Sequence, residues 1–144
     1  MITARELQRR IDRFPRVRLV NLPTPLQTMP RLTKALNGPQ LWIKKDDCTG
    51  LAFGGNKERK TEFSMGVALS KKTDIVITTE PVQSNPSLAT ATAASRLGLK
   101  VILVLSGEEP KTYDGNLLLD WLLGAEIRFL HGKAKKLGRA QFRS

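Results

Sequence analysis

From residue 56 onward, the apolar positions of the chain alternate between a helical period and short unbroken runs. Two of the segments with helical spacing end at glycines, Gly98 and Gly124, the residue type most common just past a helix. The runs between them are rich in β-branched residues, which is typical of buried parallel strands. The pattern predicts helices over residues 56–70, 85–97 and 113–123, and strands over 74–79, 101–105 and 126–130.

Strands and helices that alternate at this spacing form right-handed βαβ units, in which helices cover a parallel sheet. We therefore expect an α/β fold with an open parallel sheet and flanking helices over residues 41–132. Because ligands of such sheets bind outside the carboxyl ends of the strands, the strand-to-helix loops are the places to search for a site.

The first 40 residues are expected to form a separate N-terminal segment of extended and short helical pieces. A short amphipathic helix fits residues 3–13, and Pro15 stops it. Prolines at positions 23 and 25 keep residues 22–26 extended. The remaining pieces are a helix over 29–36, a strand over 41–44 and a loop over 46–50.

Composition and charge narrow the class of protein. The chain has 144 residues, a net charge of +11, no apolar run long enough to cross a membrane, and one cysteine, Cys48, which fits a reducing cytoplasm. Residues 133–144 carry five lysines and arginines and no acid, so we expect a disordered basic tail. Nucleic acid is disfavoured as a partner, because no aromatic interleaving, zinc spacing or recognition-helix pattern accompanies the basic residues.

The candidate site is centred on Lys57, which follows the turn Gly54-Gly55-Asn56 at the start of a helix. Adjacent glycines let the backbone adopt positive φ and approach a ligand closely, and Asn56 is a suitable N-cap. The positive end of the helix dipole disfavours a second positive charge, so the ammonium of Lys57 should lose its proton more easily than a free one. The neutral amine is the form that attacks an aldehyde. A solvated first-turn lysine is the alternative interpretation.

A second candidate loop, residues 80–86, follows a predicted strand and opens the next helix on the same side of the sheet. The hydroxyl of Ser84 and the amide of Asn85 could hold a carboxylate or a cofactor oxygen near the lysine. Plain helix capping is the alternative, because Asn85 as N-cap with Pro86 at the first helical position fits an ordinary helix start.

Several separated motifs share their order and spacing with one enzyme family. They are the stretches 13–16, 23–26, 43–47, 49–57, 59–63, 82–85, 96–100 and 115–126. Together they resemble the pyridoxal-phosphate-dependent D-cysteine desulfhydrase and 1-aminocyclopropane-1-carboxylate deaminase family, which has a tryptophan synthase β-like fold. The resemblance runs from about residue 11 to residue 130.

The resemblance implies that the cofactor is pyridoxal 5'-phosphate and that a small amino acid is converted to ammonia and a 2-oxo acid, with sulfide from D-cysteine. Lys57 resembles the lysine that forms a Schiff base with the cofactor, and Lys60 resembles a lysine that neutralises its phosphate. Asn85 is similar to an asparagine that bonds the cofactor's ring oxygen, and Ser84 to a catalytic serine near the substrate. Gln83 is expected beside them in substrate binding.

The sequence departs from the family pattern at several positions and in length. Glu80-Pro81 stands where small residues are usual, Pro86 where histidine is common, and Thr61 where leucine is usual. A carboxylate in this loop would repel an anionic substrate. Members of the family run to well over twice this length, so the resemblance covers only their N-terminal part. We therefore expect a truncated member with weak or no turnover alone.

Two classes of function stay open from the sequence. The first is an enzyme of this family or its remnant, with a small amino-acid substrate and with a second copy or a full-length homologue as partner. The second is a noncatalytic basic fragment that binds a full-length homologue or nucleic acid. No metal and no membrane are expected in either case, and His131, the only histidine, is not expected to be catalytic.

Overall fold

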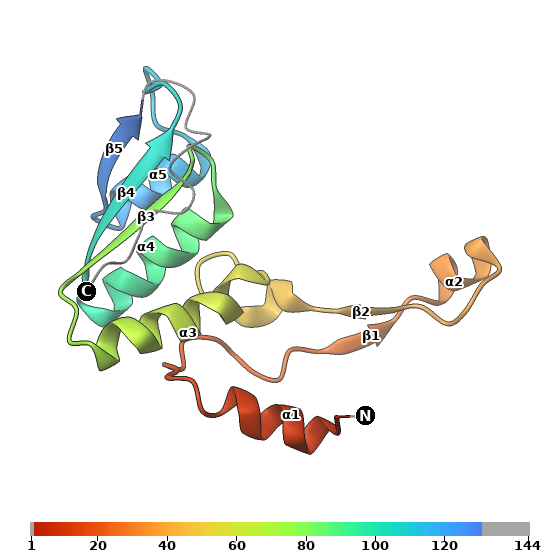
Figure 1. Cartoon of the computed structure of the whole chain (residues 1–144). Coiled ribbons are helices and arrows are strands. Elements are labelled where there is room, and N and C mark those ends of the chain that lie inside the picture. Colours follow the sequence, from red (N-terminus) through yellow and green to blue (C-terminus); the bar gives the residue numbers. More distant parts are fainter. Residues whose placement is uncertain (1, 131–144) are drawn as a thin grey trace.

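The computed structural model describes residues 2–130, which form a body of helices and parallel strands and a long arm that projects from it (Figure 1). The elements in chain order are α1 (Ala4–Ile11), β1 (Leu26–Thr28), α2 (Pro30–Leu36), β2 (Trp42–Lys44), the 3-10 helix η1 (Asp46–Thr49), α3 (Lys57–Ser70), β3 (Ile75–Pro81), α4 (Asn85–Leu97), β4 (Lys100–Ser106), α5 (Gly115–Leu122) and β5 (Glu126–Leu130). Among these residues no helix is both long and apolar enough to span a membrane.

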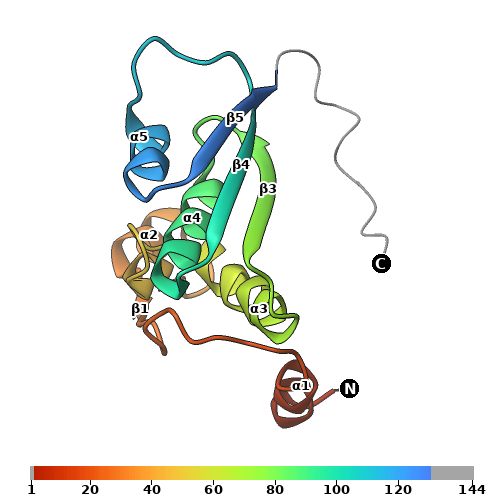
Figure 2. The same ribbon diagram turned by 90° about the vertical axis from the view of Figure 1, so that its left-hand side faces the viewer.

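Strands β3, β4 and β5 form a parallel sheet in that order, and α4 and α5 lie together on one of its faces (Figure 2). Leu103 and Leu105 of β4 pack against Leu117 of α5, and all three side chains are fully buried. The predicted α/β fold with an open parallel sheet is confirmed. Helix α4 and strand β5 begin and end at the residues that the sequence pattern predicts.

Strand β3 is less buried than its sequence suggested. It pairs with β4, and its side chains alternate between exposed and half-buried, with Ile77 63% exposed. The prediction of a buried strand is wrong here, because α4 and α5 pack on the face of the sheet that carries Val101 and Leu103 of β4, and Ile75 and Ile77 lie on the other face and stay open to solvent.

The arm consists of β1, α2 and β2. Strands β1 and β2 pair antiparallel, with Leu26 opposite Lys44, and α2 lies between them at the far end of the arm (Figure 1). The sequence predicts α2 and β2 but misses β1, because three residues are too few to show a strand period. Leu36 and Trp42 are 64% and 52% exposed, so the arm presents apolar surface that no other described residue covers.

The segment between α1 and β1 packs along α3. A Cβ atom on Gly66 of α3 would lie 2.5 Å from the carbonyl oxygen of Pro15 and 2.6 Å from the Cα of Arg16, so the two backbones are in close contact. Leu19 and Met65 belong to a second buried apolar cluster, which also includes Ala93 of α4. Helix α3 is therefore held between the N-terminal segment and α4, which fixes the position of its first turn.

The predicted division of the chain into residues 1–40, 41–132 and 133–144 stays a prediction. Strands β1 and β2 pair across the first of these boundaries. The basic tail expected over residues 133–144 lies outside the described residues.

Candidate active site

Lys57 is exposed and is the first residue of α3, directly after a glycine turn. Gly54 and Gly55 have φ angles of 77° and 139°, in the region that favours glycine. The N–H of Gly55 donates to the carbonyl oxygen of Asp46 at 2.7 Å and to the hydroxyl of Thr49 at 3.0 Å. The predicted turn and the predicted helix start are both confirmed.

Replacing Gly54 by alanine should destabilise the protein more than the same change at Gly98. Both residues have similar positive φ angles, 77° and 70°, so the conformational penalty is alike. At Gly54 the added Cβ would lie 2.1 Å from the carbonyl oxygen of Asp47, whereas at Gly98 it meets no atom within 4 Å. We expect a loss in unfolding free energy of roughly 2–4 kcal/mol for Gly54→Ala and about 1–2 kcal/mol for Gly98→Ala, measured by urea denaturation. Equal losses would show that the close approach at Gly54 does not constrain the turn.

Asn56 occupies the N-cap position of α3, but its side chain does not cap the helix. Its backbone is helical, with φ −76° and ψ −15°, and its side chain accepts no hydrogen bond from the first turn. The predicted capping role is wrong, because a capping side chain needs an extended N-cap backbone to reach the first-turn N–H groups. Asn56 therefore does not cap the first-turn N–H groups of α3, and these groups can donate to another acceptor, such as an anionic ligand.

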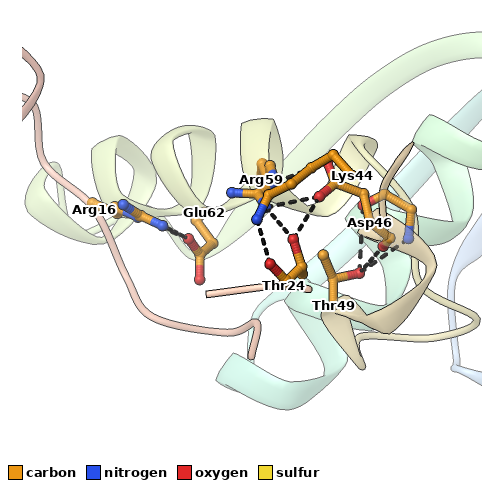
Figure 3. Close-up of polar contacts among 8 residues, drawn as sticks. Arg16, Thr24, Lys44, Asp46, Thr49, Arg59 and Glu62 are labelled. Atoms are coloured by element: carbon orange, nitrogen blue, oxygen red, sulfur yellow. Dashed lines mark hydrogen bonds and ion pairs between the residues drawn. The ribbon is translucent and has the colours of Figure 1, made fainter. Parts of the chain in front are cut away.

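An ion-paired cluster holds the glycine turn against α3 and the base of the arm (Figure 3). Arg59 donates from Nε to Oδ2 of Asp46 at 2.9 Å, and from Nη2 to Oδ1 at 2.7 Å. It also donates to Oγ1 of Thr24 at 2.8 Å, and Lys44 donates to the carbonyl oxygen of Thr24. The hydrogen bonds from Arg59 are the main reason that the pKa of Asp46 lies below its usual range. These residues stand in the sequence motifs, but the motifs gave them no role. In the structure their hydrogen bonds hold the turn before Lys57 in place.

A cavity of about 360 Å³ lies between α3, β3 and the start of α4. Lys57 and Lys60 line it from α3, Lys71 from the C-cap position directly after α3, and Glu80 from β3. Lys57 and Lys60 are three residues apart, which places them as neighbours on one face of the helix. The volume falls within the range of roughly 300–1,000 Å³ that is usual for small-molecule sites. Two predicted site residues therefore share one hollow of suitable size.

Ser84 is the N-cap of α4 and is buried. Its Oγ accepts a hydrogen bond from the N–H of Ser87 at 3.4 Å and donates to Oε2 of Glu80 at 3.3 Å. Asn85 is the first helical residue and Pro86 the second. The capping interpretation is therefore confirmed for Ser84 and wrong for Asn85, because the residue before Asn85 carries the extended N-cap backbone, with ψ 127°.

Asn85 and Gln83 are exposed and turn toward the start of α5. Oδ1 of Asn85 accepts from Nδ2 of Asn116 at 2.8 Å. The side-chain amide of Gln83 accepts from the backbone N–H of Asn116 and donates to Asp114. Both predicted residues are thus engaged with the start of α5, a contact that no local sequence pattern predicts.

The predicted site residues form two groups. The first is the lysine pair in the wall of the cavity, and the second is the loop of residues 83–85 at the carboxyl end of β3, which does not line the cavity. Glu80 joins the groups, because it lines the cavity and accepts a hydrogen bond from Ser84. The structure therefore places the two groups next to each other without merging them into one pocket.

Cys48 and His131 are the two further residues that the sequence singles out, and Cys48 does not line the cavity. Cys48 is exposed in η1, and His131 lies outside the described residues. In the part of the chain that the structure describes, no group of three or more His, Cys, Asp or Glu side chains is placed to hold a metal ion.

Fold and site together define a class of protein. A parallel α/β sheet carries an exposed lysine at the first residue of a helix and a second lysine in the same cavity, an arrangement that is compatible with covalent binding of an aldehyde. The chain belongs to the family described as pyridoxal-phosphate dependent enzyme, whose family model matches residues 17–143. Because the match continues past residue 130, the expectation that the resemblance ends there is wrong.

Relatives within this family are named for the two activities that the motifs suggested. The chain is 49% identical over 118 residues to a putative 1-aminocyclopropane-1-carboxylate deaminase of Pyrococcus abyssi, a match that covers 82% of this chain and 35% of the relative. It is 42% identical over 122 residues to the D-cysteine desulfhydrase of Klebsiella pneumoniae, covering 81% and 37% respectively. A solved structure of an aminocyclopropane-carboxylate deaminase homologue matches with a TM-score of 0.77 and 46% identity, over 85% of this chain and 37% of that one.

The family resemblance drawn from the sequence motifs is thereby confirmed. The chain spans only a little over a third of the length of these relatives, as the motifs also indicated. The activity, substrate and partners of the relatives are consequently proposals for this chain.

Proposed function

We propose that the chain forms the cofactor-lysine part of an enzyme that uses pyridoxal 5'-phosphate, with Lys57 as the point of covalent attachment. The observation that carries this proposal is the position of Lys57, which opens α3 after a glycine pair with positive φ and lines the same cavity as Lys60. An amine in this place is exposed, held on a rigid element and next to space for a ligand.

The residues around the cavity fit an aldehyde that carries a phosphate group. Lys60 lies one helical turn beyond Lys57, and the first turn of α3 offers N–H groups and the positive end of its dipole to an anion. Among the lining residues, three lysines face one acid, Glu80. The cavity therefore keeps an excess of positive charge that favours a dianionic group.

When bound, pyridoxal phosphate supplies an aldehyde and an electron sink for negative charge at the α-carbon of an amino acid. We assign covalent anchorage of the cofactor to Lys57 and neutralisation of its phosphate to Lys60. We assign to the hydroxyl of Ser84 the role of anchoring the substrate carboxylate or carrying a proton. We assign to Asn85 a hydrogen bond to the ring oxygen of the cofactor. Gln83 stays a predicted substrate contact, which requires its amide to leave α5.

The proposed substrate is a small amino acid that loses ammonia and yields a 2-oxo acid. D-Cysteine and 1-aminocyclopropane-1-carboxylate are the two candidates, because relatives are named for acting on them. The lone cysteine supports a cytoplasmic location as a further proposal.

Titration with pyridoxal phosphate tests the proposal through the visible absorption band of the bound cofactor. Lys57→Ala should abolish the band, since no other amine lies at a helix start beside a glycine turn in residues 2–130. Lys71→Ala is the matched control, because it removes a lysine from the opposite end of α3 that lines the same cavity, and it should keep the band. An equal band in the native protein and in Lys57→Ala would contradict the proposal.

A second candidate function, a noncatalytic fragment that binds another polypeptide, is favoured by the exposed apolar residues of the arm and of β3. Leu26, Leu36, Trp42 and Ile77 are each more than half exposed. Apolar surface of this kind suits a second copy of the chain or a full-length homologue. Association in sedimentation measurements, without any cofactor band, would favour this function over the first.

A further inference from the structure

Four polar side chains join the starts of α4 and α5 in one chain of hydrogen bonds. Nε2 of Gln83 donates to Oδ1 of Asp114 at 3.0 Å, and Oε1 of Gln83 accepts from the backbone N–H of Asn116 at 2.9 Å. Nδ2 of Asn116 donates to the carbonyl oxygen of Gln83 at 3.2 Å and to Oδ1 of Asn85 at 2.8 Å. We call these residues the amide relay.

The direction of every bond in the amide relay is fixed by groups that have only one role. A backbone carbonyl can only accept, so the atom of Asn116 that faces Gln83 must be its amide nitrogen. The same nitrogen meets Asn85, which must therefore present its amide oxygen. A backbone N–H can only donate, so Gln83 must turn its oxygen toward Asn116, and its nitrogen then faces the carboxylate of Asp114. If any side-chain amide of the relay flipped, two donors or two acceptors would face each other.

The free end of the relay is the amide nitrogen of Asn85. Asn85 is exposed at the first residue of α4, at the carboxyl end of β3, where ligands of parallel sheets bind. Within residues 2–130 its Nδ2 has no acceptor, while its oxygen is occupied by Asn116. With its oxygen turned toward Asn116, the side chain therefore presents its two N–H donors to whatever approaches this edge.

We propose that Asn116 is a positioning residue that sets the side chain of Asn85 as a donor, so that the ligand atom recognised there is a hydrogen-bond acceptor such as an anionic oxygen. This inference rests on the proposed function for the identity of the ligand, and on the relay alone for the orientation of the amide. It also gives a role to Asn116, which is the second residue of α5 and does not line the cavity.

Asn116→Asp tests the inference because it keeps the shape of the side chain and removes its donor. A carboxylate in the first turn of α5 suits the helix dipole, which offsets part of the loss of the hydrogen bond to the carbonyl oxygen of Gln83, so the fold should be retained. The new carboxylate repels the oxygen of Asn85, whose amide should turn to donate to it. Asn116→Ala, which removes both the donor and the acceptor, should leave the amide of Asn85 free to rotate. Thr112→Asp is the matched control, since it adds the same charge just before α5 at an exposed residue outside the relay.

The first readout needs no ligand. In proton–nitrogen NMR spectra of the whole chain, the side-chain amide of Asn116 should exchange slowly with water and that of Asn85 quickly. In Asn116→Asp the amide of Asn85 should become protected, while in Thr112→Asp it should stay as in the native protein. An Asn85 amide that is already protected in the native protein, or that does not change in Asn116→Asp, overturns the inference.

The second readout is titration with pyridoxal phosphate as the probe. In Asn116→Asp the amide oxygen of Asn85 should face the anionic oxygen of the cofactor, which should weaken binding roughly tenfold to a hundredfold. Thr112→Asp should bind the cofactor with the native affinity. Unchanged affinity in Asn116→Asp overturns the recognition of an anionic oxygen at Asn85. If the native chain binds no cofactor while the NMR pattern is as expected, the proposed function fails and the orientation of Asn85 by Asn116 stands.

Discussion

Replacing Glu62 by alanine is expected to lower the free energy of unfolding by roughly 3–5 kcal/mol. Its carboxylate is fully buried, accepts from Nε of Arg16 at 2.7 Å, and accepts from the backbone N–H groups of Leu19 at 2.7 Å and Val20 at 2.9 Å (Figure 3 shows the Arg16 pair). Alanine would leave two backbone donors and a guanidinium without their acceptor. Urea denaturation measures the loss, and faster tryptic cleavage at Arg18 would show that the N-terminal segment detaches from α3.

An exposed glutamate provides the control for this prediction. Glu6 pairs with Arg10 on the surface of α1, and Glu6→Ala should leave the urea midpoint within error of the native value. A Glu62→Ala midpoint equal to that of Glu6→Ala would contradict the role given to the buried carboxylate.

The same carboxylate sets an acid limit to stability. Burial alone raises the pKa of Glu62, but the hydrogen bonds from Leu19, Val20 and Arg16 together outweigh it, so the pKa lies below the usual 4.5. Because the pKa is lower in the folded state than in the unfolded state, the stabilisation is complete above about 4.5 and is lost as the pH falls through the folded-state pKa.

Asp120 should make the protein less stable as the pH rises from about 4 to about 7. Its carboxyl group is fully buried in α5, neither oxygen has a hydrogen-bond partner among residues 2–130, and burial raises its pKa from 3.8 to about 7. The folded state therefore holds the proton in a pH range in which the unfolded chain releases it. The stabilisation is complete below 3.8 and declines by roughly 4 kcal/mol in total until the pH passes the folded-state pKa.

Asp120→Asn should remove this decline, because asparagine has a similar shape and does not titrate. The measurement is the unfolding free energy at pH 5 and at pH 8 for the native protein and for the variant, in which the native protein should lose more. Asp74→Asn, at an exposed position before β3, is the control and should keep the native pH dependence. Parallel curves for Asp120→Asn and the native protein would show that Asp120 is ionised in the folded state throughout.

The central sheet could be predicted because its signals are local. The β-branched run of β4, the helical spacing of α4 and the glycines after α4 and α5 each specify an element within a few residues of themselves. The turn before Lys57 was predictable for the same reason, since two adjacent glycines indicate positive φ angles, which other residues avoid.

The rest depends on contacts between distant residues. The exposure of Ile75 and Ile77 in β3 follows from the packing of α4 and α5 on the other face of the sheet, which no residue of β3 encodes. Strand β1 exists only through its pairing with β2, which follows it after α2. The N-cap of α4 is Ser84 and not Asn85. Either side chain can cap a helix, and the backbone conformation determines which of the two does so.

The same distinction applies to the candidate site. Lys57 and Lys60 could be paired from their spacing on one helix, whereas the supports of the turn and the amide relay could not. Arg59 and Asp46 meet across the glycine turn, and Asn85 and Asn116 belong to successive βα units. Residue type alone does not say which polar side chains will meet over such separations.

The most direct test of the account is to map where pyridoxal phosphate attaches. After incubation of the native chain with the cofactor and reduction with borohydride, peptide mapping by mass spectrometry should find the cofactor on Lys57 at close to one equivalent. Lys60→Ala should lower the occupancy of Lys57 by weakening phosphate binding, and Lys71→Ala should not. Cofactor spread evenly over the exposed lysines, with Lys57 modified no more than Lys71, would contradict the claim that this chain presents a cofactor lysine.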